Sequence, residues 1–164
     1  MKAKLILIGG VSRSGKSTLA GELTSLLTNC ISLSQDNFVL AKEQIPTIKN
    51  RIDWEEPKSI DWTSLIDRID ELSKRHSFII IEGIFAFNSS IINDLAVYKV
   101  YLELDYELFT ERRKDEKRWG PEPAWYLEHV WNAHEKFANP YQIEFQTCCP
   151  YSTSLAQEIF ESLT

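Results

Sequence analysis

The chain has 164 residues, of which 43% are hydrophobic and 26% are charged, and its formal net charge is −6. This length and composition predict a single globular domain with a buried core. The acidic balance argues against a nucleic-acid partner, because a phosphate backbone is bound by clustered Lys and Arg. No apolar run approaches the roughly 20 residues of a membrane span. We therefore expect a protein without a nucleic-acid or membrane partner, while its oligomeric state stays open. Its three cysteines, Cys30, Cys148 and Cys149, have no disulfide or zinc spacing, which is typical of a cytoplasmic protein.

Strand-period and helix-period segments alternate along the chain, which is typical of an α/β protein with a mostly parallel sheet. Apolar runs predict buried strands at 4–8, 30–33, 77–83, 97–104 and 142–147. Apolar stripes at helical spacing, with an expected N-cap at Ser59, predict helices at 16–27, 60–72, 105–118, 124–137 and 154–164. Residues 34–58 are polar and contain prolines, so we expect connecting loops there.

The strongest motif is GVSRSGKS, which lies between the first predicted strand and the first predicted helix and fits G-x-x-x-x-G-K-[ST]. Glycines let the backbone fold around an anion, which then meets successive N–H groups and a helix N-terminus. Lys16 would supply a cation to the β- and γ-phosphates, and the Ser17 hydroxyl is a suitable ligand for Mg²⁺. The ATP-binding residues expected here are Gly10, Val11, Ser12, Arg13, Ser14, Gly15, Lys16, Ser17 and Thr18.

Further segments decide between the classes of protein that use such a loop. The sequence carries no Asn-Lys-x-Asp guanine motif, which argues against a GTPase. Asp36, in SQDNF, follows the second predicted strand, and Glu82 ends a buried strand at the edge where open α/β sheets bind ligands. The segment ERRKDEKRWGPEP supplies cations at a helix end. Phosphoryl transfer needs a phosphate-binding loop, acids that bind the metal ion, a base, and cations that close over the phosphates. These segments supply a candidate for each.

Five segments carry a resemblance: GVSRSGKSTLA, SQDNF, IDWEEPKSID, FIIIEGIFAFN and ERRKDEKRWGPEPAWYLEHVW. In this order they resemble the nicotinamide riboside kinases of the uridine kinase-like family, from the first strand to about Trp131. The resemblance implies a P-loop NTPase three-layer fold, with a five-stranded, mostly parallel sheet flanked by helices. It also implies one kinase domain over residues 1–164, with a small helical lid at about 112–125.

The activity that the resemblance implies is transfer of phosphate from MgATP to the 5′-hydroxyl of nicotinamide riboside, which makes nicotinamide mononucleotide in NAD salvage. A uridine or cytidine kinase, or a kinase for another small metabolite, is the alternative within enzymes. An ATP-binding regulatory protein without a small acceptor is the alternative from a different class. The expected partners are therefore a nucleoside and ATP, with Mg²⁺ as cofactor.

The resemblance also implies roles for individual residues. Asp36 is expected to be the catalytic base, and Lys16 and Arg113 are expected to join it in catalysis. A carboxylate is a weak base, so its main work in a loose transition state would be to orient the 5′-hydroxyl. The expected ligands of Mg²⁺ are Ser17, Asp36 and Glu82.

At the acceptor end, the resemblance implies that Asp53 accepts hydrogen bonds from the ribose 2′- and 3′-hydroxyls, with Arg113 as a second partner. Aromatic faces bind cations such as the pyridinium of nicotinamide riboside. The expected substrate contacts are Asp36, Phe38, Asp53, Trp54, Arg113 and Trp119. Arg112 and Arg118 are expected to contact the ATP phosphates. Ile52 stands where the family has an aromatic residue, and His129 is expected to pack in the interior.

Overall fold

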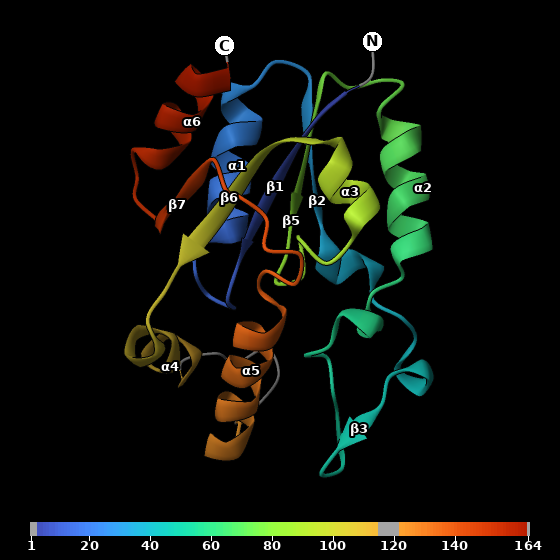
Figure 1. Cartoon of the computed structure of the whole chain (residues 1–164), viewed down its shortest axis with the longest axis vertical. Coiled ribbons are helices and arrows are strands. Elements are labelled where there is room, and N and C mark those ends of the chain that lie inside the picture. Colours follow the sequence, from blue (N-terminus) through green and yellow to red (C-terminus); the bar gives the residue numbers. More distant parts are fainter. Residues whose placement is uncertain (1–2, 115–121, 164) are drawn as a thin grey trace.

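The computed structural model describes residues 3–114 and 122–163. Five parallel strands form one sheet in the order β2-β5-β1-β6-β7 (Figure 1). The strands are β1 (Lys4–Gly10), β2 (Cys30–Ser34), β5 (Phe78–Glu82), β6 (Ala96–Glu103) and β7 (Thr147–Pro150). The predicted α/β fold with a five-stranded parallel sheet is therefore confirmed.

Helices cover both faces of this sheet, as Figure 1 shows. One face packs on α1 (Lys16–Leu26) and α6 (Leu155–Leu163), and the other on α2 (Trp62–Leu72) and α3 (Ser90–Leu95). Alternate residues of β1 serve the two layers, because successive side chains of a strand point to opposite faces. Ile6 lies in the α1/α6 layer and Leu7 in the α2/α3 layer. This two-sided burial explains the uninterrupted apolar run of the central strand.

The remaining elements lie beyond the carboxyl ends of the strands (Figure 1). Helices α4 (Tyr106–Lys114) and α5 (Ala124–Phe137) lie on one side. On the other side β3 (Thr47–Ile48) pairs antiparallel with β4 (Arg51–Ile52). Residues Lys49 and Asn50 turn the hairpin with positive φ angles of 46° and 63°, as a type I′ turn requires. The two groups of elements face each other across the edge where parallel sheets bind ligands.

Several local predictions were wrong. Residues 34–58 have little regular structure, as expected, but the β3–β4 hairpin and the short 3₁₀ turns in this segment were not predicted. Helix α2 begins after Asp61, not after Ser59, because the Asp61 carboxylate accepts the Ser64 backbone N–H at 3.0 Å. The Ser59 hydroxyl instead donates to the Glu56 carbonyl at 2.7 Å. Helix α3, capped by Ser89, was not predicted.

The last strand was also placed too early, at 142–147, whereas β7 begins at Thr147. The Asn139 side chain accepts the Ile143 backbone N–H at 2.7 Å and donates to the Ile143 carbonyl at 3.0 Å. Because a side chain satisfies this backbone, it does not pair with a neighbouring strand. Ile143 and Phe145 pack against the α2/α3 layer from the loop, which explains why their sequence looked like a strand. No helix in the described part of the chain is long and apolar enough to cross a membrane.

Candidate active site

The loop between β1 and α1 has the backbone that its glycines predict. Gly10 has a φ of 142°, and a Cβ at this position would lie 2.5 Å from the Leu102 carbonyl oxygen. Gly15, which precedes α1, has a φ of 103°. Residues with a Cβ rarely adopt either conformation, so both glycines are required for this shape. The loop places the N-terminus of α1 at the carboxyl edge of the sheet, where it can bind an anion.

Lys16 is the first residue of α1, and its side chain folds back over the loop. Its ammonium donates a hydrogen bond to the Val11 carbonyl at 2.8 Å, and the residue is only 8% exposed. Burial lowers the pKa of Lys16 to about 8, although the nearby carboxylates of Glu82 and Asp36 oppose the shift. A phosphate group beside this ammonium would favour its charged form in the same way as these carboxylates do.

A cavity of about 1090 Å³ opens at this edge and extends from the loop toward the hairpin and α5. The predicted site residues that line it are Ser12, Arg13, Gly15, Lys16, Ser17, Thr18, Asp36, Trp54, Glu82, Arg112 and Arg113. Five others are not lining residues: Gly10, Val11, Ser14, Phe38 and Asp53. Arg118 and Trp119 lie outside the described residues, as does part of the predicted lid. One cavity therefore joins the phosphate loop to Asp36, Trp54 and Arg113, three of the six predicted substrate contacts.

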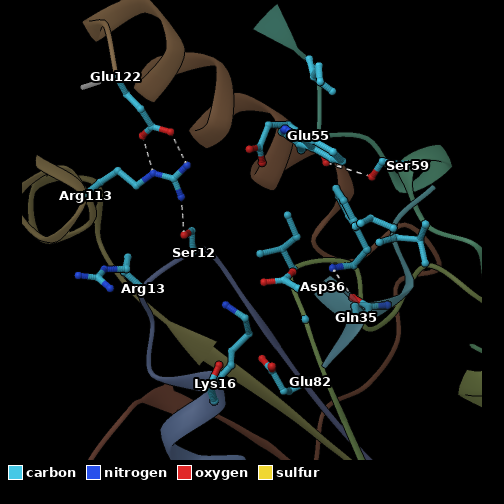
Figure 2. A pocket seen from close by; sticks show the side chains of 18 of the residues that line it. Ser12, Arg13, Lys16, Gln35, Asp36, Glu55, Ser59, Glu82, Arg113 and Glu122 are labelled. Atoms are coloured by element: carbon cyan, nitrogen blue, oxygen red, sulfur yellow. Dashed lines mark hydrogen bonds and ion pairs between the residues drawn. The ribbon is translucent and has the colours of Figure 1, made fainter. Parts of the chain in front are cut away.

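Two acids stand at the carboxyl edge beside the phosphate loop. Asp36 lies in the 3₁₀ turn that follows β2, and Glu82 is the last residue of β5, the strand that pairs with β2. Figure 2 shows their carboxylates and the Lys16 ammonium directed into the same space. Sequence position predicted this meeting, because strands of a parallel sheet end at one edge.

The oxygen donors beside the loop suit Mg²⁺. Among the described residues no cluster of three or more His, Cys, Asp or Glu could hold a metal by itself. Mg²⁺ is usually bound by one or two carboxylates together with substrate phosphates, so a complete protein cage is not required. Ser17, Asp36 and Glu82 line one cavity and offer a hydroxyl and two carboxylates, which is a fitting donor set for a phosphate-bound ion.

The arginines at the end of α4 reach the phosphate loop through different partners. The Arg112 guanidinium donates to the Arg13 carbonyl at 2.9 Å. Arg113 donates to the Ser12 hydroxyl at 2.6 Å and forms a two-pronged ion pair with Glu122. Both members of that pair are nearly buried. Sequence reasoning missed Glu122, since one acid in a strongly charged segment carries no distinguishing signal.

Of the two acids Asp53 and Glu55, it is Glu55 that lines the cavity. Glu55 lines the cavity and is 6% exposed, and the Tyr126 hydroxyl donates to its Oε1 at 3.4 Å. Burial raises the pKa of Glu55 to about 7, although the positive charge of Arg113 opposes the shift. Trp54, the residue before it, also lines the cavity.

Asp53 is directed toward helix α5 instead. Its Oδ1 accepts hydrogen bonds from His129 Nε2 at 2.8 Å and from the Glu55 backbone N–H at 3.2 Å. The expectation that His129 only packs in the interior was therefore wrong, because its imidazole pairs with a carboxylate. The two residues are 76 positions apart in the sequence, and no local pattern marks such a pair.

A phosphate loop at the carboxyl edge of a parallel sheet, facing two carboxylates and two arginines, is the arrangement of a P-loop kinase. A family model described as an AAA domain, AAA_18, matches residues 6–122. Nicotinamide riboside kinase 1 of Homo sapiens is 30% identical over 159 residues, which cover 87% of this chain and 80% of the relative. A uridine kinase of Ureaplasma parvum is 26% identical over 127 residues, covering 60% and 61%.

A solved structure of a putative fructose transport system kinase from Silicibacter has the same fold, with a TM-score of 0.67. It is 14% identical, and the match covers 91% of this chain and 90% of that one. The chain belongs to the AAA domain family whose model it matches, and it is related to the nicotinamide riboside kinases over most of its length. It is an ATP-dependent phosphotransferase for a small metabolite.

Proposed function

We propose that this kinase transfers the γ-phosphate of ATP to the 5′-hydroxyl of nicotinamide riboside and so forms nicotinamide mononucleotide. The observation that carries the proposal is the cavity itself, which joins the phosphate loop to a wall of aromatic and acidic residues. That wall contains Trp54, Glu55 and Tyr126. An aromatic and anionic surround is the chemistry that binds a pyridinium cation. The similarity to nicotinamide riboside kinases over most of the chain supports the same acceptor.

At the donor end, ATP phosphates lie in the loop between β1 and α1, against its backbone N–H groups. Lys16 and Arg113 stabilise the charge that spreads over the transferred phosphoryl group. Ser17, Asp36 and Glu82 would hold Mg²⁺, which when bound would supply positive charge to the phosphate groups. Asp36 orients the 5′-hydroxyl toward the γ-phosphate and accepts its proton late in the transfer.

At the acceptor end, we assign the ribose hydroxyls to Glu55, because the Asp53 carboxylate is already bonded to His129 and does not line the cavity. With Glu55 as the ribose acid, the residue just before it is Trp54 and not Ile52. The aromatic residue that the family has at this position is therefore present. Trp54 is proposed to stack on the pyridinium ring, and the predicted contact of Trp119 with the base stays part of the proposal.

A second candidate is a uridine or cytidine kinase, which the similarity to a uridine kinase favours. The two candidates share the ribose and phosphate contacts and differ in the charge of the base. Release of ADP, measured with purified protein and a panel of nicotinamide riboside, uridine and cytidine, decides between them. We expect the highest kcat/KM with nicotinamide riboside. Turnover of uridine but not of nicotinamide riboside would overturn the proposed acceptor.

A further inference from the structure

The segment Asp53–Glu55 carries the proposed ribose acid, yet it lies in a connection without long helices or strands. Its position is fixed by hydrogen bonds to neighbouring loops. The Asp53 backbone N–H donates to the Pro46 carbonyl at 2.8 Å, and the Ser59 hydroxyl donates to the Trp54 carbonyl at 3.1 Å. These bonds attach the segment to the hairpin side of the cavity only. Its position relative to the opposite wall depends on helix α5.

Contacts from α5 reach this segment and the hairpin beside it. The Lys49 ammonium lies 4.5 Å from the centre of the Trp125 ring, and the Arg51 guanidinium lies 5.0 Å from that of Tyr126. Such contacts between a cation and an aromatic ring are weakly stabilising at exposed sites. The strongest link is deeper, where His129 Nε2 meets Asp53 Oδ1 at 2.8 Å. It is a partly buried hydrogen bond to a carboxylate, and hydrogen bonds to ionised groups are roughly twice as strong as neutral ones.

Asp53 also contacts Glu55, so it connects Glu55 to helix α5. The same oxygen that accepts from His129 accepts the Glu55 backbone N–H at 3.2 Å. One carboxylate thus joins helix α5 to the backbone of the residue that faces the cavity. Glu55 receives a second contact from the same helix, from the Tyr126 hydroxyl one turn before His129. The backbone and the side chain of Glu55 are therefore both set by α5.

We propose that Asp53 and His129 form a positioning pair, which holds Glu55 in the orientation that binds the acceptor and joins the hairpin wall to α5. The inference rests on the proposed function, because it takes Glu55 as the group that binds the acceptor. Neither member of the pair contacts the substrate. Loss of the pair misplaces Glu55 and weakens acceptor binding, while the phosphate loop and Asp36 keep their places on the sheet edge.

The pair is tested with His129→Leu, which removes the donor, and Asp53→Ala, which removes the acceptor. Each is expected to raise the KM for the best nucleoside about tenfold, within the range of coupled contacts, with kcat and the KM for ATP changed less than about twofold. The double variant should equal Asp53→Ala, because without the Asp53 carboxylate the change at His129 removes nothing further. His129→Gln retains a donor near Nε2 and should recover most of the loss. Glu128→Gln, on the exposed side of α5, is the matched control.

Amide hydrogen exchange gives a readout that does not depend on activity. Residues 47–55 should exchange faster in His129→Leu and Asp53→Ala than in the parent protein and in Glu128→Gln, with the sheet unchanged. Unchanged exchange and unchanged KM in both single variants would overturn the pairing role, as would multiplying effects in the double variant. A parent protein that phosphorylates no nucleoside would overturn the proposed function instead, and the exchange rates would still decide whether the pair holds the segment.

Discussion

The Arg113 guanidinium and the Glu122 carboxylate form two hydrogen bonds, of 2.7 Å from Nε to Oε2 and 2.9 Å from Nη2 to Oε1. The remaining Nη1 donates to the Ser12 hydroxyl of the phosphate loop at 2.6 Å. Glu122 therefore sets the plane of the guanidinium and directs its third nitrogen at the loop. This arrangement fixes the position of a cation that phosphoryl transfer needs, before any substrate contact forms.

Arg113→Lys tests whether this geometry matters beyond its charge. Lysine keeps the cation but cannot form the two-pronged contact with Glu122 while also reaching Ser12. We expect kcat to fall at least about tenfold, because a misplaced cation stabilises the transition state less. Steady-state kinetics with ATP and the best nucleoside measure the effect, with exposed Glu111→Gln on the same helix as the control. A kcat equal to that of the parent would show that charge alone is required.

Asp36→Asn separates the binding of ATP from the transfer of its phosphate. The amide keeps the size of the side chain but can neither accept the proton of the 5′-hydroxyl nor orient it as a carboxylate does. We expect ATP binding, measured by calorimetry without Mg²⁺, to stay within about threefold, and transfer to fall by at least about a hundredfold. Turnover near that of the parent would remove Asp36 from its proposed role as base.

Glu55→Gln is expected to change stability in a pH-dependent way. The pKa of Glu55 is raised from the ordinary 4.5 to about 7 by burial, so the folded state binds more protons than the unfolded state between these values. The contribution of Glu55 to stability is therefore largest below pH 4.5 and is lost as the pH rises to about 7. Glutamine carries no charge at any pH and avoids this loss.

Thermal unfolding should consequently give a higher Tm for Glu55→Gln than for the parent at pH 8, and a difference near zero at pH 5. The same variant should bind the nucleoside more weakly, because an amide is a poorer acceptor of ribose hydroxyl hydrogen bonds than a carboxylate. Glu56→Gln provides a neighbouring control that is more exposed. An equal Tm difference at both pH values would show that the burial of Glu55 does not control its ionisation.

A 2′-deoxyribonucleoside with the same base tests the proposed recognition of the ribose. Without the 2′-hydroxyl, buried polar groups in the wall near Glu55 would lose a partner, which costs more than the absence of a contact. We expect kcat/KM to fall on the order of 10⁴ relative to the ribonucleoside. Competition between the two nucleosides in one reaction measures the ratio directly. Equal use of both would remove the assignment of Glu55 to the ribose hydroxyls.

The phosphate loop, its strand and its helix were determined by the sequence itself. The cradle is local, because one strand end, two glycines and one helix start build it within a few residues. The positions of Asp36 and Glu82 were also predictable, since buried strands of a parallel sheet end at the same edge. Helices and strands with a strong apolar period were predicted correctly. The starts of α2 and β7 were misplaced, because side-chain hydrogen bonds of Asp61 and Asn139 determine where the regular backbone begins.

Only the tertiary structure decided which acid of the IDWEE segment faces the cavity. Asp53, Glu55 and Glu56 are all acids of one short segment, and composition does not distinguish them. Helix α5 gives two of them different partners, because its His129 binds Asp53 and its Tyr126 contacts Glu55. The partner of Arg113 was settled in the same way, by Glu122. These choices depend on side chains brought together from distant positions in the chain, whereas a phosphate loop depends on backbone conformation, which a short sequence can dictate.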